Sequence, residues 1–237
     1  MTELEFPIEC VAIDFGGTLA SRSGAAPDGP AVASVLRAVD KWTMHPGFAE
    51  ALDRAMRSSH EADRRCHRQT PFASVLQSAA GACGAVLPDE VHHLAAGLFE
   101  HLPDARIDEQ AAGAVEVLAE RGFRIVLASN TRWPETARRR TLRAAGIEHC
   151  FHAVVLSSEL GIRKPHGEFY QAVVGEAGCP ANRVLFVGDT ASKDVDAPRR
   201  HGMQAMLVAS VWDRSAPASR RPPLFEEVPR LLGVAEQ

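Results

Sequence analysis

The residues of this sequence that could do chemistry follow four short apolar runs. Side chains that can attack, hold or neutralise an anion come at or soon after the end of each run: Asp14; Ser129 with Asn130; Lys164; and Asp189 with Asp194. A carboxylate can act as a nucleophile, a hydroxyl and an ammonium can hold anionic oxygens, and further carboxylates suit a hard divalent cation. Together these residue types predict a site for a phosphate group.

The elements that must position these residues are predicted by the apolar pattern. Apolar runs bounded by turn residues predict buried parallel strands at 8–14, 123–129, 152–157, 183–189 and, more weakly, 204–210. Between them lie helical patterns that end near glycine, at 108–122, 134–146 and 167–178, and one after Asp194. The alternation indicates βαβ units and a doubly wound parallel sheet of the α/β class, in which ligands bind beyond the carboxyl ends of the strands.

One interval interrupts the alternation. From about Ala20 to Asp108 no strand-like run appears, while helical patterns follow one another at 47–66, 71–84 and 88–102. This interval predicts an inserted α-helical domain, and the turn-rich residues 21–30 predict a hinge or flap that leads into it. Near the other end, 215–233 combines a proline-rich passage with one short amphipathic helix, which could cover a sheet edge or lie loose.

Composition excludes several classes of function. The chain has 237 residues, 46% of them hydrophobic and 24% charged, as in ordinary globular proteins. A net charge of -4 with dispersed arginines lacks the basic patch of a nucleic-acid binder, and no apolar run approaches the roughly 18 residues of a membrane span. The acidic N-terminus differs from a secretory signal, and five unpatterned cysteines fit reduced thiols. We therefore expect a cytoplasmic protein whose partners include neither nucleic acid nor membrane; the sequence does not indicate its oligomeric state.

The four runs and their polar residues resemble the four motifs of the haloacid dehalogenase (HAD) superfamily. The matching segments are DFGGT, LASN, RKP and GDTASKD, in that order and over nearly the whole core. The resemblance implies a HAD-like Rossmannoid core formed by 1–20 and 106–237, with a helical cap domain formed by 21–105. It also implies a hydrolase, and we expect a phosphatase that acts on a small phosphorylated metabolite.

The same resemblance implies a role for each matching residue. Asp14 would be the nucleophile and form an aspartyl-phosphate, while Ser129 and the backbone of Asn130 would bind phosphate oxygens. Thr18 would support the loop at the substrate-binding side, and Lys164 would neutralise charge between Asp14 and the phosphate.

A Mg²⁺ cofactor is also implied by the resemblance. Its ligands would be Asp189, Asp194, a carboxylate oxygen of Asp14 and the main-chain carbonyl of Gly16, which a glycine supplies as well as any residue. The lysine at position 164 fits such a site. The chain has only three lysines among 26 basic residues, and a compact ammonium suits a crowded anionic site better than a planar guanidinium.

Gly16 stands where family phosphatases carry a second carboxylate. There that group protonates the leaving group and then activates the water that hydrolyses the aspartyl-phosphate, and such groups contribute ~10² to 10⁴ in rate, or roughly 3 to 5 kcal/mol. Glycine can do neither. We therefore expect a substrate with a good leaving group, such as an acyl phosphate or an anomeric sugar phosphate, or an acid supplied by the cap or the substrate.

Other functions of the superfamily stay open. Dehalogenases lack the second carboxylate but also lack a metal site, and Asp189 with Asp194 argues against them. Phosphonate hydrolases pair a small residue at this position with Mg²⁺ but need a cap lysine, and only Lys41 lies in the cap region. Slow hydrolysis could favour phosphotransfer to another acceptor, and a weakly catalytic relative could be a ligand-binding regulator.

Several polar residues near these motifs are interpreted as surface. Arg132 and Trp133, just after the second motif, could reach the substrate, but the start of a surface helix is the preferred interpretation. The histidines and arginines of the cap could face an anionic substrate, but most are interpreted as a solvated helix face: His45, His60, Arg64, Arg65, His67 and Arg68.

Overall fold

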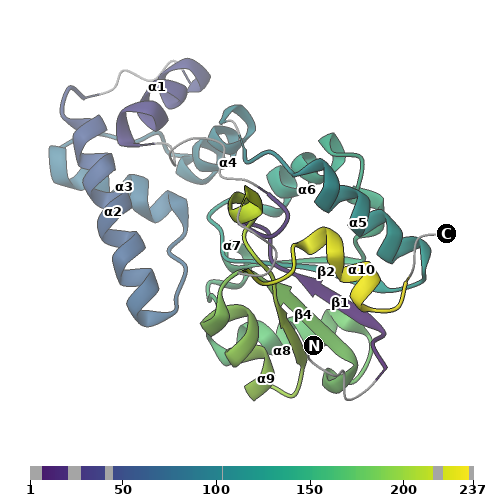
Figure 1. The fold of residues 1–237 in the computed structure, drawn as a ribbon. Helices are drawn as coiled ribbons and strands as arrows, with labels where there is room; N and C mark the ends of the chain where they lie inside the picture. Colours follow the sequence, from purple (N-terminus) through teal and green to yellow (C-terminus); the bar gives the residue numbers. More distant parts are fainter. Residues whose placement is uncertain (1–6, 21–27, 41–44, 103, 216–220, 235–237) are drawn as a thin grey trace.

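The computed structural model describes residues 7–20, 28–40, 45–102, 104–215 and 221–234. Its core is a parallel five-stranded sheet with the strand order β3-β2-β1-β4-β5. The strands are β1 (Cys10–Ile13), β2 (Arg124–Ser129), β3 (Ala153–Leu156), β4 (Val184–Gly188) and β5 (Gln204–Leu207). All the predicted strands are present, and because they are parallel their carboxyl ends lie along one edge of the sheet (Figure 1).

Both faces of the sheet are buried. In β1, Val11 and Ile13 pack into one hydrophobic cluster while Cys10 and Ala12 pack into another, and all four are fully buried. The covering helices are α5 (Glu109–Glu120) and α6 (Glu135–Ala144) on the first face, and α8 (Gly167–Ala177) and α9 (Ala197–Arg200) on the second. Burial on both faces explains why the strands are nearly uninterrupted apolar runs.

Short helical elements join these parts. They are η1 (Glu148–Cys150), α7 (Ser157–Leu160), η2 (Ala181–Arg183), η3 (Ala191–Asp196) and η4 (Val211–Ser215). Of these, η3 is a π-helix directly after β4. Such wide turns occur often at functional sites, which singles out the segment that carries Asp194.

The C-terminal segment packs on α5. Phe225 of η6 (Phe225–Glu227) and Val228 of α10 (Val228–Leu231) are buried in the same cluster as the apolar face of α5. The predicted short C-terminal helix is confirmed, and it covers a helix rather than a sheet edge. Residues 216–220 of the predicted proline-rich passage lie outside the described residues.

A helical domain is inserted between β1 and α5, as predicted. It consists of α1 (Gly29–Asp40), α2 (Phe48–Cys66), α3 (Phe72–Cys83) and α4 (Val91–His101), which build a hydrophobic cluster largely of their own. Figure 1 shows these helices to one side of the sheet. The predicted turn-rich segment 21–30 lies mostly outside the described residues, and its last part is corrected because α1 already begins at Gly29.

A third connection joins this helical domain to the core, besides the two points where the chain crosses over. The turn between α2 and α3 lies against the segment before Lys164, where Arg68 pairs with Ile162 as an isolated antiparallel bridge. The main-chain N–H of Arg163 donates to the carbonyl of His67 at 3.1 Å, and that of Gln69 donates to the carbonyl of Gly161 at 2.9 Å. The helical domain is therefore hydrogen-bonded to the loop that carries a predicted site residue.

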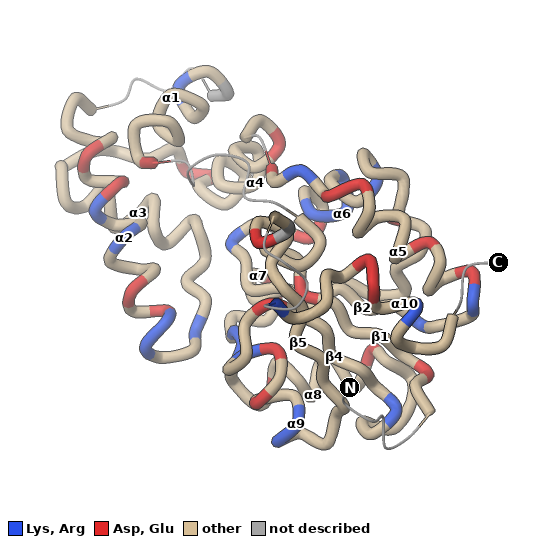
Figure 2. The backbone as a smooth tube through the Cα atoms, in the orientation of Figure 1, with Lys and Arg blue, Asp and Glu red and all other residues tan. Residues whose placement is uncertain are grey.

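Charged residues are interspersed over both parts of the molecule. Figure 2 shows both basic and acidic positions in the inserted domain and in the core. Within the described residues, no helix combines the length and the apolar character needed to cross a bilayer. The cytoplasmic location stays a prediction.

Candidate active site

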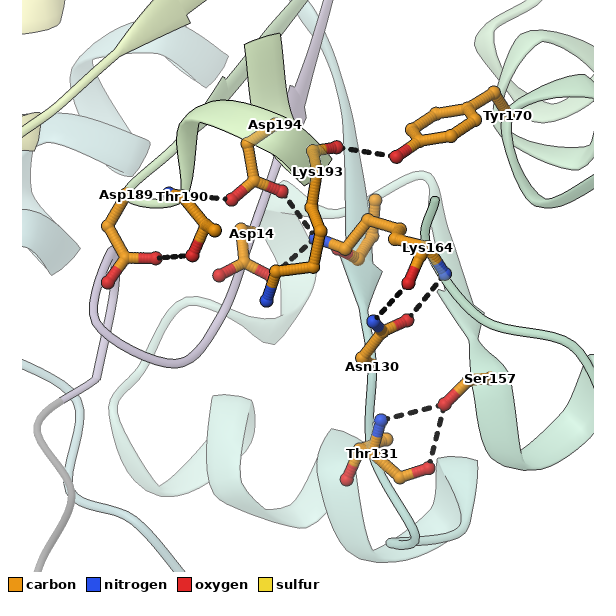
Figure 3. A network of polar contacts seen from close by, with 11 residues as sticks. Asp14, Asn130, Thr131, Ser157, Lys164, Tyr170, Asp189, Thr190, Lys193 and Asp194 are labelled. Atoms are coloured by element: carbon orange, nitrogen blue, oxygen red, sulfur yellow. Dashed lines mark hydrogen bonds and ion pairs between the residues drawn. The ribbon is translucent and has the colours of Figure 1, made fainter. Parts of the chain in front are cut away.

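The predicted site residues of the four motifs meet at the carboxyl edge of the sheet. Asp14 follows β1, and its N–H donates to the carbonyl of Val187 in β4 at 2.9 Å. Ser129 is the buried last residue of β2. Oxygen atoms of Asp14, Asp189 and Asp194 all lie within 4.8 Å of one another, so three separate segments contribute to one carboxylate cluster (Figure 3).

Lys164 lies at the centre of this cluster, and its ammonium group donates three hydrogen bonds. Its Nζ donates to Oδ1 of Asp14 at 2.6 Å, to Oδ1 of Asp194 at 2.8 Å and to the carbonyl of Ala128 at 2.9 Å. The side chain is buried, and although burial opposes its charge, the two carboxylates raise the pKa of Lys164 above its ordinary value. Lys164 is therefore a permanent cation that orients the two aspartates.

Negative charge exceeds positive charge in the cluster. Three carboxylates surround one ammonium, and the pKa of Asp14 is raised to about 6, by burial above all and also by Asp194 and Asp189, while Lys164 lowers it. Burial likewise raises the pKa of Asp189. Crowded carboxylates of this kind would be stabilised by a divalent cation that takes oxygen ligands, so the side chains fit the Mg²⁺ implied by the sequence.

Two glycines make room for these carboxylates. A Cβ on Gly17, whose φ is +90°, would lie 2.0 Å from Oδ2 of Asp189. A Cβ on Gly188 would lie 2.4 Å from Cγ of Asp194. Both positions thus require glycine, because a carboxylate side chain approaches the backbone closely there. The sequence signal for this requirement is a glycine next to, or close to, a predicted metal ligand.

Gly16 is different, because nothing in the packing requires a glycine there. It is exposed, a Cβ would meet no atom within 4 Å, and its φ lies outside the left-handed region. Steric constraints therefore do not explain the absence of a carboxylate at position 16.

Asn130 and Thr18 each have a structural environment that the sequence did not reveal. The Asn130 side chain accepts from the N–H of Lys164 at 2.8 Å and donates to the carbonyl of the same residue at 2.9 Å (Figure 3). It thereby clamps the backbone of Lys164 to the end of β2. Thr18 is fully buried, and its hydroxyl has no hydrogen-bond partner among the described residues.

Tyr170 holds the π-helix that carries Asp194. This buried residue of α8 donates its hydroxyl hydrogen to the carbonyl of Lys193 at 2.5 Å (Figure 3). Its ring stacks on that of His201. The carboxylate of Asp194 is held from the other side by the N–H of Thr190 at 3.0 Å. The sequence carried no signal for Tyr170, because the contact joins two helices on one face of the sheet.

Arg138 is a second buried cation near Asp14 that the sequence did not indicate. Its guanidinium lies 3.6 Å from the ring centre of Phe15, the residue after Asp14. It also forms an ion pair with Asp104 at 2.8 Å, just before the chain returns to the core. Arg138 thus connects the second crossing between the domains to the loop that follows Asp14.

A cleft of about 550 Å³ lies between the helical domain and the core, next to this site. Its apolar wall includes Phe99 of α4 and Trp133, whose rings are 5.1 Å apart. Arg132 also lines the cleft and donates to Oγ of Ser59 in α2 at 2.8 Å. The interpretation of Arg132 and Trp133 as the start of a surface helix is wrong, because α6 begins only at Glu135 and both side chains face the helical domain.

Known proteins resemble this chain in sequence. A family model described as haloacid dehalogenase-like hydrolase matches residues 8–202. The phosphoserine phosphatase of Thermus thermophilus is 28% identical over 141 residues, which cover 60% of this chain and 54% of that protein. The glyceraldehyde 3-phosphate phosphatase of Methanothermobacter thermautotrophicus is 31% identical over 97 residues, or 39% of this chain and 40% of that protein. The matches thus span about half or less of these relatives.

Solved structures resemble the chain over nearly its whole length. The 2-haloacid dehalogenase of Pseudomonas syringae pv. tomato DC3000 has a TM-score of 0.63 at 20% identity, with 95% of this chain and 98% of that chain covered. The HAD-hydrolase YfnB of Bacillus subtilis, bound to magnesium, has a TM-score of 0.59 at 14% identity, with 96% and 99% covered. At these identities the likeness concerns the fold alone.

Proposed function

Because this chain belongs to the haloacid dehalogenase-like hydrolase family, we propose that it is a Mg²⁺-dependent phosphatase that hydrolyses a small phosphorylated metabolite through Asp14. The observation that carries the proposal is the buried Lys164, which holds Asp14 beside two further carboxylates. Phosphatases among the curated relatives support the same reaction.

Hydrolysis would proceed in two steps at Asp14. A carboxylate oxygen of Asp14 attacks phosphorus, the bond to the leaving oxygen breaks, and that oxygen departs with the bonding electrons. Water then attacks the phosphorus of the aspartyl-phosphate, which releases inorganic phosphate and regenerates the carboxylate. Lys164 fixes the orientation of Asp14 through its 2.6 Å contact, while Ser129 and the backbone of Asn130 bind phosphate oxygens.

The Mg²⁺ ligands in this proposal are Asp14, Asp189, Asp194 and the main-chain carbonyl of Gly16. When bound, the cation supplies positive charge that offsets the phosphate oxygens. The excess of carboxylates over ammonium groups in the cluster supports this choice, and the magnesium-bound YfnB has the same fold. The carboxylates also argue against dehalogenation, although dehalogenases share the fold.

The division into domains follows the same proposal. We assign 1–20 and 106–237 to the core and 21–105 to the cap, supported by the separate hydrophobic clusters of the two parts. Lys41, the cap lysine that phosphonate hydrolysis would need, lies outside the described residues.

Phosphotransfer is a second candidate that one observation favours. The exposed Gly16 leaves no side chain at the position of the usual base, so hydrolysis of the aspartyl-phosphate would be slow and another acceptor could compete with water. A regulator that binds a phosphorylated ligand remains the alternative if Asp14 is never phosphorylated.

The test is phosphate release with Mg²⁺ from acetyl phosphate, an anomeric sugar phosphate, an alkyl phosphate and p-nitrophenyl phosphate. Asp14→Asn should abolish release, whereas Asp89→Asn, the same change at an exposed position of the helical domain, should not. Release that survives Asp14→Asn, or no release from any of these esters, would refute the proposal. Transfer of labelled phosphate from Asp14 to an added alcohol would identify the phosphotransferase.

A further inference from the structure

One wall of the cleft between the two domains carries side chains that can donate hydrogen bonds to an anion. His60 of α2, Arg132 and Arg163 all line it, and Asn130 lines the same cleft where it meets the backbone of Lys164. Arg163 directly precedes Lys164 in the chain, and Asn130 holds the Lys164 backbone, so this wall adjoins the backbone of the residue whose ammonium contacts Asp14. A molecule whose phosphate lies at Asp14 would extend along this wall.

The main chain of Arg163 is hydrogen-bonded, whereas no hydrogen bond of its side chain is described. Its main-chain N–H is bonded to the carbonyl of His67, and the neighbouring Ile162 forms the bridge with Arg68. Its half-buried guanidinium makes no hydrogen bond or close ion pair with any described residue, although the charge of Asp63 acts on it. A partly desolvated guanidinium whose donors make no described hydrogen bond is an available binding group, since its planar donors match an oxyanion in a bidentate manner.

The acidic groups near this wall are already engaged or exposed. Asp63 is buried and accepts hydrogen bonds from Thr70 and Gln69, and it lies 3.8 Å from Arg132. Asp53 forms an ion pair with Arg57, and Glu61 is exposed at the mouth of the cleft.

The charged residues described in the lining of the cleft balance in number, because Arg57, Arg132 and Arg163 stand against Asp28, Asp53 and Glu61. Arg57 and Arg132 form ion pairs with Asp53 and Asp63, which leaves Arg163 as the arginine of this lining for which no ion pair is described. The pKa of His60 is lowered, first by burial and then by Arg163, Arg132 and Arg64. Figure 2 shows basic positions at the C-terminal end of α2, the end that lies against the core through the Arg68 bridge.

We propose that Arg163, with His60 beside it, forms a subsite for a second oxyanion on the substrate, a carboxylate or a second phosphate, while Phe99 and Trp133 pack against the carbon chain between the two anions. The inference rests on the proposed function for the position of the first phosphate. It makes Arg163 a specificity-determining residue and narrows the substrate to phosphate esters with a second negative group.

The test is calorimetric binding of unreactive phosphonates in Mg²⁺ buffer. 3-Phosphonopropionate carries a carboxylate where propylphosphonate ends in a methyl group, and propane-1,3-bisphosphonate carries a second phosphonate. The protein should bind at least one of the two dianionic probes roughly 10- to 100-fold more tightly than propylphosphonate, as expected for a charge-assisted pair. Which of the two probes binds more tightly identifies the second anion.

Substitutions locate the effect at Arg163. Arg163→Ala should remove the preference, and Arg163→Lys should keep part of it, because the charge remains while the bidentate geometry is lost. Arg65→Ala, which removes an exposed charge from the same end of α2, should retain the full preference. Equal affinity for all three probes, no measurable binding, or a preference that survives Arg163→Ala in a protein of unchanged thermal stability would overturn the subsite.

Hydrolysis of acetyl phosphate, measured separately, distinguishes the two proposals. Hydrolysis that depends on Asp14, without any preference for the dianionic phosphonates, would refute the subsite alone. A preference that depends on Arg163, without any hydrolysis, would refute the phosphatase alone.

Discussion

Replacing Gly16 by aspartate should give the protein the acid-base group that its sequence lacks. A Cβ at this exposed position meets no atom within 4 Å, and φ lies outside the left-handed region, so the new side chain fits without strain. Loss of glycine restricts the unfolded chain, which stabilises the folded protein by about 0.4 to 1 kcal/mol. Repulsion from the three carboxylates nearby costs about 1 kcal/mol per pair at 4 Å in water, or roughly 3 kcal/mol for all three, so a net loss of stability of up to about 2 kcal/mol is expected.

The effect on catalysis should be larger than the effect on stability. A positioned carboxyl group lowers the barrier by roughly 3 to 5 kcal/mol, equivalent to ~10² to 10⁴ in rate. The gain should appear with alkyl phosphates, because their leaving oxygen needs a proton, and should be small for the first step with acyl phosphates. The assay is kcat/KM, which reports the steps up to phosphorylation of Asp14, for butyl phosphate and acetyl phosphate with the native protein and Gly16→Asp.

Gly16→Asn is the matched control, since it has nearly the same shape but cannot transfer a proton at neutral pH. An increase with Gly16→Asp that Gly16→Asn reproduces would show that the side chain acts through packing. Equal increases for both esters in the first, phosphorylating step, or no increase for butyl phosphate, would refute the reasoning that leaving-group protonation is what the native protein lacks.

Three further predictions concern the cluster and the C-terminal turn. Gly17→Ala should raise the Mg²⁺ concentration needed for half-maximal thermal stabilisation, since its Cβ would displace Asp189. The control is Gly84→Ala, which has φ +71° but open space around its Cβ and should cost only about 1 kcal/mol of backbone strain. An equal Mg²⁺ dependence of the two variants would contradict the prediction. Lys164→Met should reduce the free energy of unfolding in denaturant by about 3 to 5 kcal/mol, because it leaves buried carboxylates without their cation, and a loss under about 1 kcal/mol would argue against that role. The pKa of Glu227 is held below its ordinary value of 4.5, chiefly by the N–H of Leu224. The contribution of Glu227 to stability is therefore complete above pH 4.5 and is lost as the pH falls through the lower pKa of the folded state. The Tm difference between the native protein and Glu227→Gln should shrink on acidification, and a Tm difference independent of pH would refute this prediction.

The class of fold and the edge of the sheet that carries the candidate site were predictable because both depend on short stretches of sequence. Each apolar run that becomes a strand is followed at once or within a few residues by its polar residue, so Asp14, Ser129 and Asp189 lie where parallel strands end. The helical insertion was equally predictable, because helix periodicity and the absence of strand-like runs are visible within short windows. Both signals depend only on neighbouring residues.

Other features were decided by contacts between distant segments. The clamp of Asn130 on Lys164 joins residues 34 positions apart, and the ion pair of Arg138 with Asp104 joins another such pair. A strand-end asparagine or a helical arginine looks the same in a sequence whether it faces solvent or the interior.

The sequence by itself therefore predicted a set of candidate groups for a phosphate and determined at which edge of the sheet they lie. The tertiary structure decided how they are held, because packing brings the helical domain against Arg132 and Trp133 and leaves the Arg163 guanidinium without a hydrogen bond among the described residues. Local pattern encodes the period and the ends of an element, whereas the partner of a side chain depends on how the elements pack, and no short stretch of sequence contains that information.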